Sequence, residues 1–294
     1  MKFIDKILLI DRRWIYLSVL LAVTIPLLFP IGLPITYSPP VKSVFEKIDN
    51  LPEGSAILLS FDFGPGSAPE ISPMAYAILR HCFAKRDKVI VMTLTVDGAT
   101  LAENIVKTVV NEINQTRQLT DTGKKEGPLV KGRDYAQLGF KVGVAVAIMN
   151  MGASILKAFP TDYAGEMTAS QPIFKNIRQL SDVNLMIDLA AVATPEIWIA
   201  YGREMFKFDM AIGCTGIIAP SYYPYLNSHQ IVGLIGGLKG AAEYERMIVD
   251  AGYYDKPGKA TKGMDAQSIV HLMTVVLVLF TNTIYLLRKR KTIK

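Results

Sequence analysis

Cysteine and histidine are scarce in this chain of 294 residues, which contains two cysteines and three histidines. Two cysteines do not make the disulfide framework of a small secreted protein. We therefore expect Cys82 and Cys214 either to pair once or to be buried as small apolar side chains. No His, Cys and Asp residues show the paired spacing of a metal site, and the Gly-Lys-Ser/Thr ending of a phosphate-binding loop is missing. The sequence thus predicts neither a metal nor a cofactor.

The body of the chain also lacks net charge, although the whole chain has a formal net charge of +6. Nine of the 32 basic residues and two of the 26 acidic residues lie in two tails, residues 1–13 and 288–294, so the residues between them carry a net charge of −1. A nucleic-acid surface needs a basic face on the domain itself. The sequence therefore predicts no nucleic-acid partner.

Long apolar runs are present near both ends. Residues 14–33 and 269–287 contain no Asp, Glu, Lys or Arg, and each would form a helix about 30 Å long, the thickness of a bilayer's hydrocarbon core. We predict two transmembrane helices, 14–34 and 266–287, and the lipid bilayer as a partner. Because basic residues flank the outer end of both, the positive-inside rule places both tails in the cytoplasm and residues 35–265 across the membrane. The alternative for the first run, a cleaved signal peptide, fits neither its length nor its prolines.

One stretch sets the pattern of the domain between these runs. A nearly continuous apolar segment predicts a strand at 55–62, buried on both faces of a parallel sheet. A helix at 73–86 follows, with either Ser67 or Ser72 as its N-cap, and a second apolar strand is predicted at 88–95. Strand, crossover helix and strand within about 40 residues form a βαβ unit.

The same alternation continues along the chain. Further strands are predicted at 135–140, 184–190 and 210–218, and helices at 41–48, 99–116, 144–159, 195–206 and 230–251. A polar loop at 118–133 is long enough to be either functional or disordered. The pattern predicts a Rossmann-like three-layer α/β fold, with a doubly wound, mostly parallel sheet flanked by the two transmembrane helices. It does not predict the order of the strands.

Ligands of such sheets bind outside the carboxyl ends of the strands. The polar and glycine residues at these positions are the predicted ligand-binding residues: Asp62, Gly64, Gly66, Ser67, Asp97 and Thr215. The Gly64-Pro-Gly66 segment resembles the start of a dinucleotide-binding fingerprint, but Pro69 replaces its third glycine. The alternative for Asp62 is a structural one, a side chain that accepts backbone N–H groups in a turn.

A catalytic interpretation of the chain needs a nucleophile and a base. The only constellation that the sequence offers for a hydrolase is Cys214 as the nucleophile, His229 as the base and Asp62 as the residue that orients the base. Each of these residues also has an ordinary structural explanation, because small thiols and turn carboxylates are common in cores and loops. The hydrolase is therefore the alternative and not the leading hypothesis.

Glycine and tyrosine are concentrated in one late segment. Gly233, Gly236, Gly237 and Gly240 fall in the predicted helix 230–251, and Tyr222, Tyr223 and Tyr225 precede it. Glycines in a helix cost about 1 kcal/mol each relative to alanine, so a close approach of backbones must offset them. The approach is either to the domain's own sheet or to another subunit, and the tyrosines form either a binding surface or a packed loop.

The second apolar run contains two polar residues, His271 and Asn282. We expect their side chains to reach the membrane interface, and helix pairing within the membrane is the alternative. A Rossmann-like pattern implies a fold and not a function. With two anchors and no coherent catalytic set, the sequence predicts a non-catalytic binding or assembly module in a membrane complex or homo-oligomer.

Overall fold

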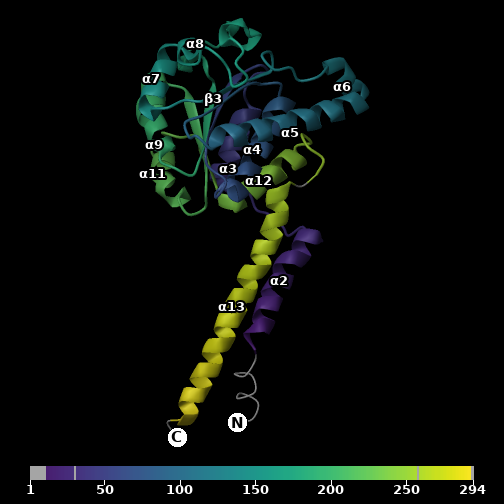
Figure 1. Cartoon of the computed structure of the whole chain (residues 1–294). Helices are drawn as coiled ribbons and strands as arrows, with labels where there is room; N and C mark the ends of the chain where they lie inside the picture. Colours follow the sequence, from purple (N-terminus) through teal and green to yellow (C-terminus); the bar gives the residue numbers. More distant parts are fainter. Residues whose placement is uncertain (1–10, 30, 257, 293–294) are drawn as a thin grey trace. The chain divides into compact units, whose positions relative to one another are not determined.

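The computed structural model describes residues 11–29, 31–256 and 258–292. The chain divides into two compact units. One, which we call the domain, is Ile35–Ala260, and the other, the anchor unit, consists of the parts of the chain on either side of it. Figure 1 shows the sheet and its helices in the domain, and the two long helices of the anchor unit. Predictions that concern residues 1–10 lie outside the described residues.

The domain contains a sheet of six parallel strands in the order β3-β2-β1-β4-β5-β6. The strands are β1 (Ala56–Asp62), β2 (Lys88–Thr93), β3 (Tyr135–Phe140), β4 (Leu185–Ala190), β5 (Asp209–Cys214) and β6 (Gly233–Gly236). The chain builds outward from β1 in one direction and then returns to build outward in the other. This order defines a doubly wound α/β fold and creates a switch point between β1 and β4. The predicted α/β class is confirmed, with every described strand pair parallel.

Helices cover both faces of the sheet (Figure 1). On one face lie α3 (Pro39–Asp49), α4 (Ala68–Ala84), α5 (Gly98–Leu119) and α12 (Gly237–Asp250), with the short α6 (Asp121–Glu126) after α5. On the other face lie α7 (Val144–Ala153), α8 (Ile155–Ala158), α9 (Thr194–Trp198), α10 (Glu204–Phe206) and α11 (Tyr223–Asn227). The three-layer arrangement follows from strands that are apolar on both faces, since β1 and β4 are buried along their whole length.

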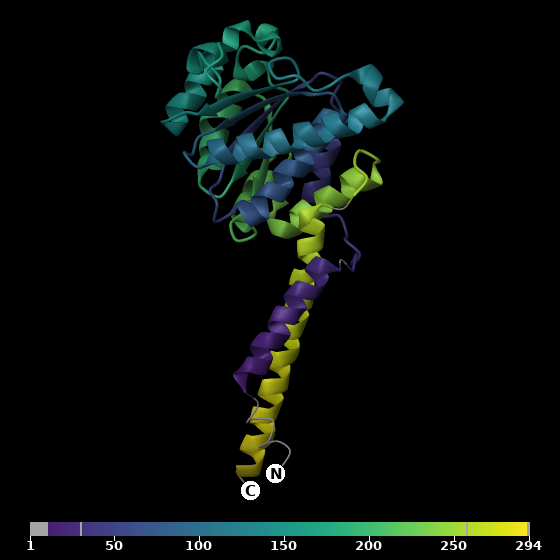
Figure 2. The same ribbon diagram turned by 45° about the vertical axis from the view of Figure 1, so that its right-hand side comes forward.

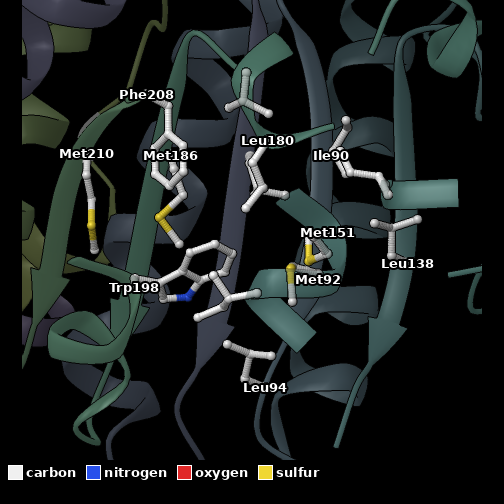
Figure 3. Packing of buried hydrophobic residues seen from close by; sticks show 14 of the residues in the cluster. Ile90, Met92, Leu94, Leu138, Met151, Leu180, Met186, Trp198, Phe208 and Met210 are labelled. Atoms are coloured by element: carbon white, nitrogen blue, oxygen red, sulfur yellow. The ribbon is translucent and has the colours of Figure 1, made fainter. Parts of the chain in front are cut away.

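The core between the sheet and the second helical layer is built around Trp198. Figure 3 shows its indole beside the sulfur-containing side chains of Met186, Met92 and Met151, with Leu180 above them. All of these side chains are fully or almost fully buried. Burial of a side chain of this size stabilises the fold by about 1.5–3 kcal/mol relative to exposure. This core holds the carboxyl end of β4 in place beneath α9.

Several helix boundaries differ from the predicted ones. α4 begins after Ser67, the first of the two proposed caps, because Pro69 fits the first helical turn, where backbone N–H groups have no partner in the helix. The predicted helix 144–159 is interrupted at Ser154, whose extended backbone ends α7 and whose side chain accepts a hydrogen bond from the backbone N–H of Lys157 in α8. The predicted loop 118–133 contains α6.

The predicted helix 230–251 is wrong in its first third. β6 occupies Gly233–Gly236, and α12 starts at Gly237, which has a φ of +61°. A Cβ atom at Gly233 would lie 2.5 Å from a methyl group of Val44 and 2.7 Å from the carbonyl oxygen of Pro40, both in α3. Contact with α3, and with Ala219 at Gly236, therefore accounts for these glycines within the domain. Glycine favours a strand here because a side chain would separate β6 from α3.

The anchor unit contains α2 (Arg12–Leu28) and α13 (Lys259–Thr292), which lie side by side in both Figures 1 and 2. In the described part of the chain one helix, α13 over Lys259–Leu286, is long and apolar enough to cross a membrane. The two membrane-length helices of the prediction are thus reduced to one. α2 has 17 residues, about 26 Å of helix, because the chain leaves the helix after Leu28.

The segment after α2 is organised by a carboxylate. The backbone N–H groups of Ile31, Gly32 and Leu33 donate hydrogen bonds to the Asp265 carboxylate of α13 over 2.9–3.1 Å. Gly32 takes a φ of +71°, which few other residues tolerate. Three backbone donors thus surround one buried carboxylate. The segment that was predicted to complete the first span instead turns around Asp265.

Candidate functional site

The switch point brings two aspartates together at the carboxyl end of the sheet. Asp62 ends β1, and Asp188 of β4 lies in register with Ser60 of β1. Because strand side chains alternate, Ser60, Asp62 and Asp188 share one face of the sheet. Asp62 accepts hydrogen bonds from the Ser60 hydroxyl at 2.5 Å, from the Leu94 backbone N–H at 2.5 Å and from the Thr93 hydroxyl at 3.3 Å. Asp62 therefore joins the ends of β1 and β2.

The two carboxyl groups differ in what stabilises their charge. Burial raises the pKa of both, and the pKa of Asp188 is raised further, because the charge of Asp62 opposes ionisation of its neighbour. The hydrogen bonds that Asp62 accepts favour its ionised form. Neither oxygen of Asp188 makes a hydrogen bond of normal geometry within the described part of the chain. Asp188 is consequently the member of the pair whose neutral form is favoured more strongly.

Cys214, the predicted nucleophile, lies next to this pair, but its surroundings favour the thiol over the reactive thiolate. Cys214 ends β5 in register with Ala190 and is fully buried. Burial, together with the charges of Asp188 and Glu70, raises the pKa of its thiol to about 12. A catalytic cysteine needs the opposite environment, one that stabilises the thiolate. Cys82 is also buried and unpaired, so the two cysteines follow the small apolar alternative.

The structure does not bring the three residues of the hydrolase alternative together. His229 lies between α11 and β6, where its carbonyl oxygen accepts a hydrogen bond from Arg203 at 2.9 Å. Three residues later, the backbone N–H of Val232 donates to Met210 at the start of β5. His229 is therefore exposed near the amino edge of the sheet, opposite to Cys214 and Asp62. Because β6 is parallel to β5, it has to start at the amino edge. The segment that leads to β6 therefore places His229 at that edge, far from Cys214 and Asp62.

The predicted ligand-binding residues all lie at the carboxyl edge. Gly64 approaches Asp97, since a Cβ atom at Gly64 would lie 3.2 Å from an Asp97 carboxylate oxygen. Gly66 is in the same loop, Ser67 precedes α4, and Thr215 follows β5. Placement at this edge follows from the parallel sheet, and ligand binding by these residues stays a prediction. Sequence reasoning missed Glu70, whose carboxylate accepts a hydrogen bond from the Gly216 backbone N–H at 2.8 Å and joins α4 to the loop after β5.

The most unusual feature of this edge is a row of exposed aliphatic side chains. The loops after β3, β2, β4 and β5 each carry one such residue, two or three positions beyond the strand: Val142, Val96, Val192 and Ile217. Their exposed fractions are 76%, 72%, 43% and 88%, respectively. With neighbouring strands about 4.8 Å apart, five strands extend the row over about 20 Å. We call these four residues the aliphatic row. A sequence signal exists for Val96 and Val142, which are isolated in polar or glycine-containing loops, but not for Val192 between two alanines or for Ile217 before Ile218.

The tyrosines divide between core and surface. Tyr222 is buried, and its hydroxyl donates a hydrogen bond to Glu196 at 3.3 Å. Tyr223 is exposed and Tyr225 is half-buried, with its ring 6.3 Å from that of Tyr222. Only part of this segment is therefore available as a binding surface.

The opposite, amino edge of the sheet contains a charged cavity of about 720 Å³. Arg86, Lys88, Arg117, Lys125 and Arg133 line it together with Glu53, Asp87, Glu126 and Asp134. The exposed carboxylates are paired, for example Arg86 with Glu126 at 2.7 Å and Lys88 with Asp134 at 3.2 Å. Asp87 is buried in the wall, and burial raises its pKa to about 7. In the described ranges, no group of three or more His, Cys, Asp and Glu side chains could hold a metal ion.

Compared with protein-family models, with curated proteins and with solved structures, the chain matches none of them. The strand order and the helical layers place the domain among Rossmann-like α/β proteins. Members of that class have many unrelated functions, so the class does not identify an activity.

Proposed function

We propose that this protein is a membrane-anchored α/β domain that works as a non-catalytic binding or assembly module, and that the aliphatic row is its binding surface. The observation that carries this proposal is the exposure of Val96, Val142, Val192 and Ile217 along one edge of the sheet. Isolated apolar residues are common on protein surfaces, whereas apolar residues that gather on one edge mark an interaction site. An apolar surface that covers this edge removes all four side chains from water.

The chemistry beneath the row supports binding rather than catalysis. Asp62 and Asp188 are buried below the surface, and Cys214 is held as a thiol. A catalytic acid or base has to come within hydrogen-bonding distance of its substrate. The hydrogen bonds of Asp62 join β1 to the end of β2 and hold this edge rigid, which is what a binding surface needs.

The anchor unit supports attachment to a membrane, with α13 as one crossing helix. We propose that α2 crosses as well, since its 17 residues stand at the lower end of the range for membrane-spanning helices. Arg12 and Arg13 then lie at the start of α2, and the basic residues 288–294 follow the apolar part of α13 on the same side. By the positive-inside rule this side is the cytoplasm, which leaves the domain extracytoplasmic.

Photo-crosslinking tests the aliphatic row. A photoreactive residue at Ile217 in the membrane-bound chain should form adducts, and the double substitution Val96→Ser/Val142→Ser should abolish them without changing the thermal unfolding midpoint. Leu119 is the matched control, because it is an equally exposed aliphatic residue at the end of α5, away from the carboxyl edge. Absence of adducts at Ile217, or equal adducts at Leu119, would contradict the proposal.

Cysteine labelling tests the topology. The native cysteines are buried, so a membrane-impermeant thiol reagent reports on introduced ones. The Lys107→Cys variant, on the exposed side of α5, should be labelled in intact cells. The Arg12→Cys variant should be labelled only after the cells are lysed. The reverse pattern, or a chain that stays in solution without detergent, would rule out the arrangement.

A further inference from the structure

One face of α13 collects the polar side chains of its apolar segment. At 100° per residue, Gln267, His271, Thr274, Thr281, Asn282 and Tyr285 fall within an arc of about 100°. Of the residues between 267 and 285, only Ser268 and Thr283 are polar and lie outside that arc. Polar residues that were scattered to let a helix reach the interface would not gather on one face. The arrangement indicates a contact along the helix.

The spacing of this face is that of a packed helix pair. Positions 267, 271, 274, 278, 281 and 285 follow one another at intervals of four and three residues, with Val278 at the one apolar position. Such a repeat keeps two helices in contact along a left-handed crossing of about 20°, the commonest arrangement in membranes. We call these six positions, together with Asn282 at the border of the same arc, the polar seam. All six side chains are exposed in the anchor unit.

α2 covers a different seam of α13. Five positions along this part of the helix, Ala266, Val270, Met273, Leu277 and Ile284, are buried or half-buried and follow a second four-three repeat in which only Phe280 is exposed. This repeat is displaced by one residue, or about 100°, from the polar seam. α2 runs alongside α13 in both views of the molecule (Figures 1 and 2). The polar seam therefore stays open after α2 has packed.

We infer that the polar seam is the contact between two parallel copies of this chain within the membrane, an inference that rests on the proposed membrane insertion of α13. In hydrocarbon a polar side chain gains most from a hydrogen bond to another helix. The amides of Gln267 and Asn282 each donate and accept, so each can pair with its own counterpart. Thr274 and Thr281 already donate to the carbonyl oxygens of Val270 and Leu277, at 2.8 and 2.7 Å, and offer acceptors to the neighbour.

A second copy of the chain fits this seam because it presents the same polar residues at the same depth in the membrane. Two copies that insert by the same rule are parallel, so identical heptad positions meet across a two-fold axis. His271 then faces His271, and Asn282, which flanks the repeat one residue after Thr281, lies beside its counterpart at a matching depth in the bilayer. A slip in register would separate these polar side chains from their counterparts. The seam thus specifies both orientation and register.

Disulfide trapping tests the contact in native membranes. The Val278→Cys variant should form a covalent dimer on mild oxidation, because a disulfide needs Cα atoms within about 7 Å. The Val276→Cys variant is the matched control, since it replaces the same residue type with nearly the same exposure on the opposite side of α13. Equal trapping at both positions, or trapping of Val278→Cys to a different protein, would overturn the inference of a second copy.

Replacing Asn282 measures how much a polar side chain contributes to the stability of the dimer. Asn282→Leu should raise the dissociation constant of the full-length dimer in detergent about threefold to tenfold, the usual effect of one hydrogen bond between membrane helices. Thr283→Leu, one residue along but outside the seam, should leave it unchanged. An unchanged constant for Asn282→Leu would contradict the inference. A chain that does not fractionate with membranes would instead refute the proposed insertion, so the two failures are distinguishable.

Discussion

The two edges of the sheet treat charge in opposite ways. At the amino edge the carboxylates of Glu126 and Asp134 lie beside an open cavity and are paired with Arg86 and Lys88, respectively. At the carboxyl edge Asp62 and Asp188 are buried, and exposed aliphatic side chains lie above them. Exposed ion pairs contribute only about 0–1 kcal/mol each, and their charges are already satisfied.

The difference indicates which edge needs a partner. Water satisfies the charged amino edge, so nothing is gained when another surface covers it. The aliphatic row is the reverse case, because covering it releases water from apolar surface at about 25 cal/mol per Å². The comparison supports our proposal that the edge with the buried carboxyl pair is the binding surface.

The largest expected effect comes from the tight packing under the carboxyl edge. A Cβ atom at Gly98 would lie 2.0 Å from the carbonyl oxygen of Phe61 and 2.3 Å from the Thr93 hydroxyl. Gly98→Ala should lower the free energy of unfolding by about 4 kcal/mol, since backbone cannot move aside cheaply. Gly66→Ala, in the loop before α4, meets nothing within 4 Å and should change it by less than about 0.5 kcal/mol. Thermal unfolding measures the stability of both variants. Equal losses of stability would show that the backbone around Gly98 at the carboxyl edge can move aside.

Asp62→Ala should have the next largest effect. The substitution leaves the Leu94 N–H and the Ser60 hydroxyl buried without their acceptor. The expected loss of unfolding free energy is about 2–4 kcal/mol. Asp62→Asn retains an acceptor and should lose less than half as much. Urea unfolding measures the effect. If Asp62→Ala were as stable as the unmodified chain, the hydrogen bonds of Asp62 would not hold β1 and β2 together.

The third prediction concerns Asp87 at the amino edge, whose ionisation should make the free energy of unfolding depend on pH. The folded-state pKa of Asp87, about 7, lies above its ordinary value of 3.8. The folded state therefore keeps a proton that the unfolded state has lost, so this stabilisation is complete below about pH 4 and disappears as pH rises through 7. Asp87→Asn cannot ionise and should be more stable than the unmodified chain at pH 8, by about 2 kcal/mol, and not at pH 4. Unfolding midpoints at both pH values provide the measurement, and parallel pH curves would contradict the assignment.

The smallest expected effect concerns the row itself. Ile217→Ser removes an exposed methyl-rich side chain that packs on nothing in the isolated domain. Its free energy of unfolding, measured by thermal unfolding, should change by less than about 0.5 kcal/mol. A large loss of stability would mean that Ile217 packs within the domain, and the comparison between the two edges would then lose its sharpest element.

Sequence periodicity predicted the core of the domain well. The strands at Ala56–Asp62, Tyr135–Phe140 and Leu185–Ala190 were located within one residue at each end, because strands buried on both faces are continuous apolar runs. It failed at β6, where four residues of glycine, leucine and isoleucine form a strand only because β5 and α3 leave a narrow space for them. It also failed for α2, whose end is decided by Asp265, more than 230 residues away along the chain.

The candidate site shows the same division. Alternation of strands and helices placed Asp62, Asp97 and Thr215 at one edge, since parallel strands all end on the same side. The partner of Asp62 could not be predicted, because Asp188 meets it only through the pairing of β1 with β4. His229 was misplaced for a related reason, since its edge depends on the existence of β6.

Local patterns along the chain were sufficient for the class of fold, for β1, β3 and β4, and for the apolar helix α13, because these depend on repeats of two or 3.6 residues or on continuous apolar runs. Three-dimensional contacts were needed for the strand order, for the meeting of Asp62 with Asp188, and for the alignment of Val142, Val96, Val192 and Ile217 along one edge. These features join segments far apart in the chain, and a local pattern carries no information about which strand will lie beside which.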